Sequence, residues 1–340
     1  MAMREFMLIL VTSITLSVGA TVLSRRVALV TGFLDHAEGY KRHGAPVPLL
    51  GGIAIYSAFT VSLIVWGDRL YVVQLITILM GASLMSFLGL WDDRRALSPL
   101  MKFAGQLLVT ALIILSGMQV NVFGSAVLNV LVTAIWVIYI TNSFNLLDNM
   151  DGLATGVAVI ASAFFLLGAV LNGQYLVGSL SAALLGACLG FLYFNFNPAR
   201  IFMGDAGSLF IGFVMAAVGI KVRFPDNVDY VTWMVPVLVL GLPIFDTALV
   251  VVSRLRRGQP IWQGGRDHVS HRLAARGWST RKVVTVLYVV AAFVGAVAVM
   301  ISILRPMPAY IMGASVLAVA LWFLWRLGLK SQAAHNLQAT

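Results

Sequence analysis

The sequence has little charge and almost no cysteine. Of its 340 residues, 11% are charged and 60% are hydrophobic, and the mean hydropathy is +0.94. A water-soluble domain needs a polar surface, so this composition excludes a soluble globular protein. The single cysteine, Cys188, lies in an apolar run. A disulfide framework and a thiolate metal site are therefore excluded, and Cys188 is predicted to be a packing residue.

Long apolar runs dominate the chain instead. We expect an all-α polytopic membrane protein with eleven spans, at about 5–23, 49–66, 71–90, 103–117, 125–141, 154–172, 175–194, 207–221, 231–252, 283–304 and 309–325. The first run lacks a small-residue cleavage site and is predicted to be retained. The fourth and eighth runs are short for a bilayer and are predicted to start inside the preceding loops. Residues 1–340 form one predicted integral-membrane domain.

The distribution of basic residues predicts the orientation. Of the 23 Lys and Arg residues, eighteen fall in the tail and in the loops at about 24–48, 91–102, 142–153, 195–206 and 253–282. The positive-inside rule makes this side cytoplasmic, with the N-terminus periplasmic and the C-terminus cytoplasmic. The net charge of +10 is thus a topology signal, and we expect no nucleic-acid partner.

Acidic residues gather on the same predicted side, which the positive-inside rule does not explain. They are Asp35, Glu38, Asp92, Asp93, Asp148, Asp151, Asp205 and Asp267, with Asp246 about two turns inside the ninth run. Carboxylates mixed with cations suit a divalent metal ion together with phosphates. We therefore place the active site on the cytoplasmic loops.

The most polar stretch between two apolar runs contains Asn142, Asn145, Asp148, Asp151 and Gly152. If the backbone there is helical, the spacing of three places the oxygen atoms of Asn145, Asp148 and Asp151 on one face. The alternative is a short polar loop between two membrane helices.

The first two loops offer cations and a pair of carboxylates. Lys41 and Arg42 either bind a phosphate or only set the topology. Asp92 and Asp93 repel each other, which favours one metal ligand and one general base, although most such pairs are solvated helix ends. Lys102 follows in the second loop as a candidate substrate contact.

The last two loops carry candidate anion sites. Gly204 and Gly207 flank Asp205 where backbone N–H groups can meet an anion, and Phe202 either stacks on a base or seals the helix start. His268 and His271 lie three apart without a convincing third zinc ligand, so phosphate contacts are favoured. An amphipathic helix on anionic lipid is the alternative. Asp246 is either functional or paired with an arginine.

Taken in chain order, these motifs resemble the polyprenyl-phosphate N-acetylhexosamine-1-phosphate transferases, in particular the WecA and TagO type. The resemblance extends from about Pro46 to Arg272. It rests on Trp91-Asp92-Asp93, Asn142-x-x-Asn145-x-x-Asp148-x-x-Asp151-Gly152, Phe202-Met-Gly-Asp205-x-Gly-Ser208, Leu242-Pro-x-x-Asp246-Thr and Asp267-His268-x-x-His271-Arg272.

The resemblance implies transfer of a sugar-1-phosphate from a UDP-N-acetylhexosamine to undecaprenyl phosphate, with release of UMP, at the bacterial cytoplasmic membrane. N-acetylglucosamine is the expected sugar, and the lipid-linked product, undecaprenyl-diphosphate-sugar, is expected to start a glycan of the O-antigen, common-antigen or teichoic-acid type. The implied cofactor is Mg²⁺, with Mn²⁺ as a substitute, held by Asp93, Asp205 and Asn145. The implied catalytic residues are Asp92, Asp93, Asp148 and Asp151. The implied substrate contacts are Lys41, Lys102, Asn142, Asn145, Asn195, Phe202, Gly204, Asp246, His268, His271 and Arg272.

One position departs from the family pattern. Ser270 stands where WecA-like and TagO-like proteins commonly carry a histidine, which affects the expected sugar specificity, and the His-His-His-x-Glu pattern of the MraY branch is absent. A transporter or flippase of an anionic lipid or nucleotide sugar and a membrane scaffold are the alternatives from other functional classes. Gly186 and Gly190 form a GxxxG pattern typical of close helix packing, within the chain or at a homodimer face.

Overall fold

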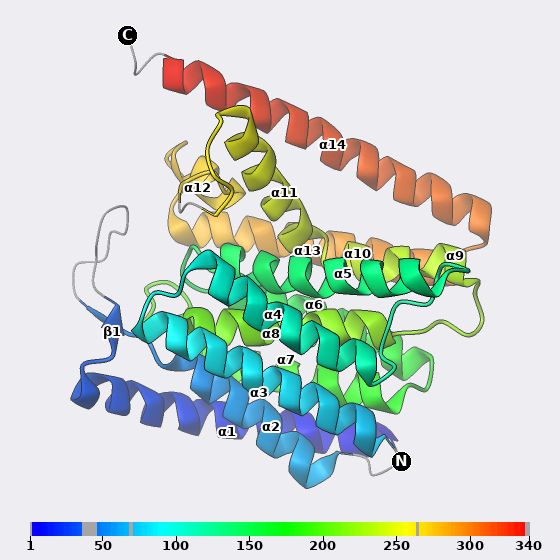
Figure 1. The fold of residues 1–340 in the computed structure, drawn as a ribbon, viewed down its shortest axis with the longest axis horizontal. Coiled ribbons are helices and arrows are strands. Elements are labelled where there is room, and N and C mark those ends of the chain that lie inside the picture. The colour runs from blue at the N-terminus through cyan, green and yellow to red at the C-terminus, as the bar shows by residue number, and fades with distance from the viewer. Residues whose placement is uncertain (1, 36–45, 68–70, 263–264, 337–340) are drawn as a thin grey trace.

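The computed structural model describes residues 2–35, 46–67, 71–262 and 265–336, and it is a bundle of α-helices (Figure 1). The helices run over Ala2–Thr31 (α1), Gly51–Trp66 (α2), Val72–Arg94 (α3), Pro99–Leu115 (α4), Ala126–Leu147 (α5), Leu153–Leu171 (α6), Tyr175–Asn195 (α7), Gly204–Lys221 (α8), Asp229–Thr232 (α9), Met234–Val239 (α10), Gly241–Arg256 (α11), Val269–Ala274 (α12), Thr280–Ile303 (α13) and Pro306–Asn336 (α14). A short antiparallel pair, β1 (Leu34–Asp35) and β2 (Val47–Pro48), accompanies them.

All eleven predicted apolar runs are helical, which confirms an all-α membrane protein with several spans. Within the described ranges, eight helices are long and apolar enough to cross a bilayer, and a bent pair makes a ninth candidate. The helices α2 and α4 are shorter. The eleven-span count and the orientation therefore stay predictions. The fourth and eighth runs do begin in the preceding loops, at Pro99 and Gly204, as expected.

The ninth run, expected as one span at about 231–252, is not one continuous helix. It is broken at Leu240, and its two arms, residues 229–239 and 241–256, meet at 73°. Pro243 falls in the first turn of α11, where a missing backbone N–H costs no helical hydrogen bond. In Figure 1 the α11 helix rises from the bundle toward α14. The break therefore turns the polar end of this run out of the main helix layer.

Serine caps decide where several helices begin. The side chains of Ser98, Ser125 and Ser279 each accept a backbone hydrogen bond from the first turn of α4, α5 and α13. At α4 the cap is followed by Pro99, whose fixed backbone angle suits the first helical position. Lys102 consequently lies in the first turn of α4, directly after the end of α3.

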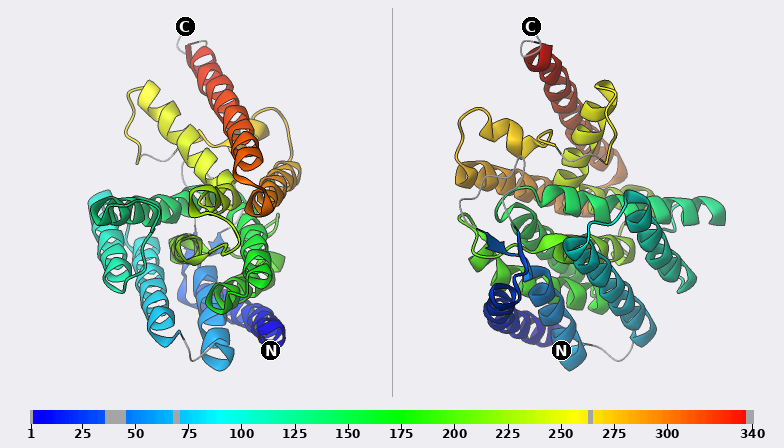
Figure 2. Two further views of the ribbon diagram at one scale, coloured as in Figure 1. Left: turned by 90° about the vertical axis from the view of Figure 1, so that its right-hand side faces the viewer. Right: turned by 60° about the vertical axis from the view of Figure 1, so that its left-hand side comes forward.

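The most buried helix is α8, which packs against α2, α3 and α5. Glycines on the partner helices permit this close approach. A Cβ added at Gly89 on α3 would lie 2.2 Å from the backbone oxygen of Asp205, and one at Gly52 on α2 would lie 2.2 Å from the backbone nitrogen of Gly207. The first turn of α8 is therefore held directly against the ends of two other helices. Figure 2 shows the same packing from two further sides.

The GxxxG pattern on α7 is used within the chain. A Cβ at Gly186 would lie 2.6 Å from the backbone oxygen of Leu10, and one at Gly190 would lie 2.7 Å from the side chain of Ser17. The buried Ser17 hydroxyl donates to the Ala187 carbonyl at 2.6 Å. This glycine face is thus covered by α1 and does not form the homodimer face that we had considered. A homodimer through another surface stays a prediction.

We expect Gly89→Ala to destabilise the protein by about 1–3 kcal/mol, because the added methyl group overlaps backbone atoms of α8 that cannot swing away. Gly19→Ala is the matched control, since Gly19 lies on exposed α1 with nothing within 4 Å of the new methyl group. The thermal midpoint of each full-length variant in detergent measures the effect. Equal midpoints for the two variants would contradict the close α3–α8 crossing.

Candidate active site

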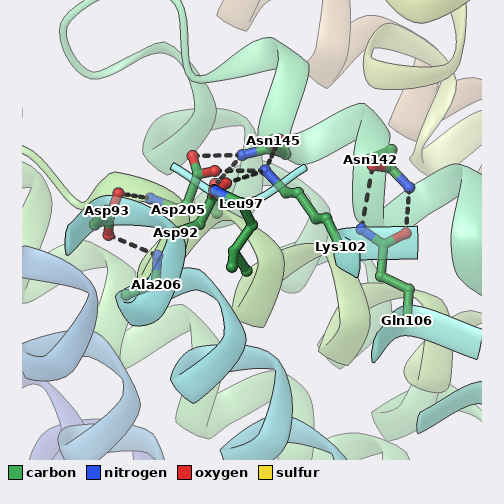
Figure 3. Close-up of polar contacts among 10 residues, drawn as sticks. Asp92, Asp93, Leu97, Lys102, Gln106, Asn142, Asn145, Asp205 and Ala206 are labelled. Atoms are coloured by element: carbon green, nitrogen blue, oxygen red, sulfur yellow. Dashed lines mark hydrogen bonds and ion pairs between the residues drawn. The ribbon is translucent and has the colours of Figure 1, made fainter. Parts of the chain in front are cut away.

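The centre of the site is the ammonium group of Lys102 (Figure 3). Its Nζ donates to Asp92 Oδ2 at 2.9 Å, to Asn145 Oδ1 at 3.1 Å and to Asp205 Oδ2 at 2.5 Å. These oxygen atoms come from the end of α3, the last turn of α5 and the first turn of α8. Loops far apart in the sequence therefore meet at one point. Their placement on the same predicted side of the membrane had led us to expect this.

Asp93 binds the start of α8. Its Oδ1 accepts the N–H of Asp205 at 2.8 Å, and its Oδ2 accepts the N–H of Ala206 at 3.1 Å. A carboxylate at a helix N-terminus satisfies free N–H groups and interacts favourably with the helix dipole. Gly204 has φ +65°, and an added Cβ would lie 2.5 Å from Asp93 Oδ2. The glycine thus makes room for this carboxylate, which is the physical reason for its place beside Asp205.

Asn145 links the cluster to a second side chain on α8. Its Nδ2 donates to Asp205 Oδ1 at 2.8 Å and to Ser208 Oγ at 2.9 Å. The remaining carboxylate oxygen of Asp92 accepts the N–H of Leu97 at 2.7 Å. Every side chain of the cluster is therefore held by more than one contact, which fixes the position of its oxygen atoms.

Asn142 forms a reciprocal amide pair with Gln106, which we had not predicted as a site residue. The two hydrogen bonds measure 3.2 Å and 2.6 Å. Gln106 lies one turn after Lys102 on α4, so the two side chains share a face of that helix. A lone amide within an apolar run, spaced four residues from a candidate cation, was the available sequence signal. The pair ties α4 to α5 beside the cluster.

The expected helical face through Asp148 and Asp151 does not form, because α5 ends at Leu147 and Asp148 is its C-cap. The prediction that Asn145, Asp148 and Asp151 share one helical face is therefore wrong. Asp151 Oδ2 accepts instead from Asn197 Nδ2 at 2.8 Å and from the Ala199 N–H at 3.0 Å. Asp151 thus braces the loop that leads to α8, and the catalytic roles of Asp148 and Asp151 stay predictions.

The loop before α8 is fastened on two sides. The buried side chain of Asn195 accepts from Thr155 Oγ1 at 2.8 Å and donates to the Ile201 carbonyl at 3.1 Å. Phe202 is half-buried, and its backbone N–H donates to the Pro48 carbonyl at 2.8 Å. These contacts give Asn195 a bracing role and place Phe202 beside β2. Lys41, another predicted substrate contact, lies outside the described residues.

Asp246 and His268 form a buried pair. His268 Nδ1 lies 2.7 Å from Asp246 Oδ2, and the Val269 N–H donates to Asp246 Oδ1 at 2.8 Å. Both side chains are almost fully buried. Asp246 is therefore paired, as one of our two alternatives required, but with a histidine and not with an arginine. The pair fastens the start of α12 to α11.

Arg272 and Ser270 hold the same segment from its other side. Arg272 donates to the Asp267 carbonyl, to Ser253 Oγ and to the Leu327 carbonyl, each at 2.7 Å. Ser270, only 1% exposed, donates to Asn149 Oδ1 at 2.5 Å. In this structure Arg272 fastens three chain segments, and Ser270 connects α12 to the end of α5. The residue that departs from the family pattern thus makes a buried hydrogen bond between α12 and the turn after α5.

His271 remains as the half-buried imidazole of this segment. Its ring meets that of His268 edge to face, with centroids 5.9 Å apart. Burial lowers the pKa of His271, and the nearby charges of His268 and Arg266 lower it further. His271 is therefore neutral at pH 7 and can accept a hydrogen bond from a ligand.

The cluster has the donor chemistry that a hard divalent cation prefers. Asp92, Asn145 and Asp205 direct three oxygen atoms at one cationic centre. In the described part of the chain, no three His, Cys, Asp or Glu side chains gather in a metal-binding arrangement. The third oxygen atom of this cluster belongs to the amide of Asn145. Asp93, a predicted ligand, lies in contact with Asp205 through the helix start. The oxygen donors that meet Lys102 are of the type that Mg²⁺ prefers, and metal binding stays a prediction.

Comparisons with known proteins identify the family of this chain. Residues 75–223 match glycosyl transferase family 4. A probable undecaprenyl-phosphate N-acetylglucosaminyl 1-phosphate transferase of Bacillus subtilis is 34% identical over 280 residues, covering 79% of this chain and 77% of the relative. A decaprenyl-phosphate N-acetylglucosaminephosphotransferase of Mycobacterium tuberculosis is 30% identical over 322 residues, covering 84% and 80%. An undecaprenyl-phosphate alpha-N-acetylglucosaminyl 1-phosphate transferase of Escherichia coli is 25% identical over 309 residues, covering 85% and 82%. The chain therefore belongs to glycosyl transferase family 4 and, within it, to the polyprenyl-phosphate N-acetylhexosamine-1-phosphate transferases.

Proposed function

We propose that the protein transfers N-acetylglucosamine-1-phosphate from UDP-N-acetylglucosamine to undecaprenyl phosphate and releases UMP, at the cytoplasmic face of a bacterial membrane. A phosphate oxygen of the lipid attacks the phosphorus next to the sugar, and the bond from that phosphorus to the bridging oxygen breaks, so that the bridging oxygen and its electron pair leave with UMP. The product, undecaprenyl-diphosphate-N-acetylglucosamine, would start a cell-surface glycan. The relatives are named as transferases, which favours this function over transport.

The convergence of Asp92, Asn145, Asp205 and Lys102 carries the proposal. Two anionic substrates repel each other, so the site that joins them must supply positive charge. Mg²⁺ held by these three oxygen atoms would act as a Lewis acid toward the phosphoryl oxygens. The ammonium of Lys102 is another source of positive charge at the site, and Asp92 would orient the incoming lipid phosphate.

The α12 segment supplies the other side of the site. Asn149, in the turn after α5, contacts Ser270, so the last turn of α5 and the turn that follows it connect the oxygen cluster to the histidine segment. In Figure 1, α12 lies at the same end of the bundle as the junction between α3 and α4. Neutral His271 and the backbone near His268 would contact the diphosphate or the sugar. Asp246 and Arg272 act as positioning residues, because their contacts hold this segment.

Purified protein with UDP-N-acetylglucosamine, undecaprenyl phosphate and Mg²⁺ is expected to release UMP. Asp92→Asn and Asp205→Asn should each lower the rate about 100-fold or more, because they remove a group that orients substrate or holds the ion. Asp226→Asn changes an exposed carboxylate outside the site and should keep wild-type activity. Lipid-linked product measured with a panel of UDP-N-acetylhexosamines identifies the sugar. No product from any of them would refute the proposal.

Asp246→Asn is expected to lower the ratio kcat/KM about 10- to 100-fold, because the variant loses the charge-assisted bond that holds His268. Backbone hydrogen exchange in residues 266–274 should become faster at the same time. The asparagine side chain can still accept the Val269 N–H, but it cannot also keep the present contact with His268. Asp226→Asn again serves as the control. Unchanged exchange together with full activity would show that Asp246 does not position this segment.

A further inference from the structure

Lys102 is bound by the protein as a free cation would be. An ammonium group has three N–H donors, and here each meets an oxygen atom from a different helix: Asp92 on α3, Asn145 on α5 and Asp205 on α8. The side chain is 18% exposed, so it is enclosed but not sealed from solvent. The bond network therefore uses the full donor capacity of the lysine.

The other oxygen atoms of the cluster already accept protein hydrogen bonds. Asp92 Oδ1 accepts from Leu97, both Asp93 oxygens accept from the first turn of α8, and Asp205 Oδ1 accepts from Asn145. A divalent ion that displaced the backbone N–H groups from Asp93 would break the contacts that hold the start of α8. The three atoms that face Lys102 can change partner without disturbing that backbone.

A metal ion and the ammonium cannot occupy the same place. The oxygen atoms lie 2.5–3.1 Å from Lys102 Nζ, and two positive centres so close together would repel strongly. Conversely, the carboxylates of Asp92 and Asp205 repel each other unless a cation lies between them. The cluster therefore needs a cation and has room for one at a time.

We propose that Lys102 is a tethered cation that closes the oxygen cluster in the metal-free protein and is exchanged for the divalent ion. Its flexible side chain then turns toward the space where the substrate phosphates enter. The inference rests on the proposed function, since that function supplies the need for the ion. It assigns Lys102 two successive partners: the carboxylates before metal binding and a phosphate oxygen after it.

Metal binding to Lys102→Met tests the exchange without any assay of transfer. Calorimetric titration of the full chain in detergent with MgCl₂ should give a dissociation constant about tenfold lower than that of the wild type, because no hydrogen bonds to lysine need to be broken. The metal-free variant should have a lower thermal midpoint than the wild type, and Mg²⁺ should raise it by more. Lys282→Met is the matched control, since Lys282 lies over the Trp278 ring and outside the cluster.

A second measurement uses the unaltered protein and so does not depend on how the variant folds. Amine acetylation followed by mass spectrometry should modify Lys102 slowly without metal and severalfold faster with Mg²⁺, whereas modification of Lys282 should not change. The exchange would be overturned if Lys102→Met binds Mg²⁺ as tightly as the wild type or more weakly. It would also be overturned if acetylation of Lys102 stays constant or slows when Mg²⁺ is added. If Mg²⁺ binds and supports UMP release in either of those cases, the proposed function survives alone. Absence of Mg²⁺ binding in both proteins would overturn the exchange and the metal requirement together.

Discussion

Carboxylates placed at the end of a buried helix have to be neutralised, and this requirement organises the protein. Asp93 and Asp205 face each other across the start of α8, where unpaired charges would cost several kcal/mol in a membrane. The helix N-terminus offsets one of them through two backbone N–H groups. The ammonium of Lys102 offsets the charge of Asp205 and also that of Asp92. The site is thus stable because each of these negative charges has a partner.

The glycines of the bundle give this arrangement its precision. Charge pairing falls off when partners move apart, so the ends of α3, α5 and α8 must stay in register to within a fraction of an ångström. Close backbone contact at Gly89 fixes α3 against the start of α8, and close contact at Gly52 fixes α2 there, since backbone atoms cannot rotate away as side chains do. In a membrane, where lipid competes well with apolar side chains, such small-residue contacts are the available means of tight packing. The helix crossings and the chemistry are therefore parts of one constraint.

Much of the fold and part of the site follow from the sequence alone. Apolar runs locate the helices because the bilayer sets their length, and loop parity groups Asp92, Asn145 and Asp205 because membrane crossing sorts residues by side. Contacts between side chains do not follow in this way. Sequence spacing assumed a helix through Asp148 and Asp151, but α5 ends earlier, and the Asp151 carboxylate meets a loop. The central place of Lys102 and its neighbour Gln106 depends on a three-helix junction that no local pattern encodes.

The bend in the ninth run explains why a distant histidine segment belongs to the same site. If residues 229–256 formed one straight helix, Asp246 would lie along the direction of the first arm, residues 229–239. The break at Leu240 turns α11 away, and Asp246 then meets His268, while Ser270 meets Asn149 at the end of α5. The end of α5 consequently has the oxygen cluster on one side and α12 on the other. Under the proposed function, a donor with a diphosphate would need contacts beyond the oxygen cluster, and the bent run would supply the support for them.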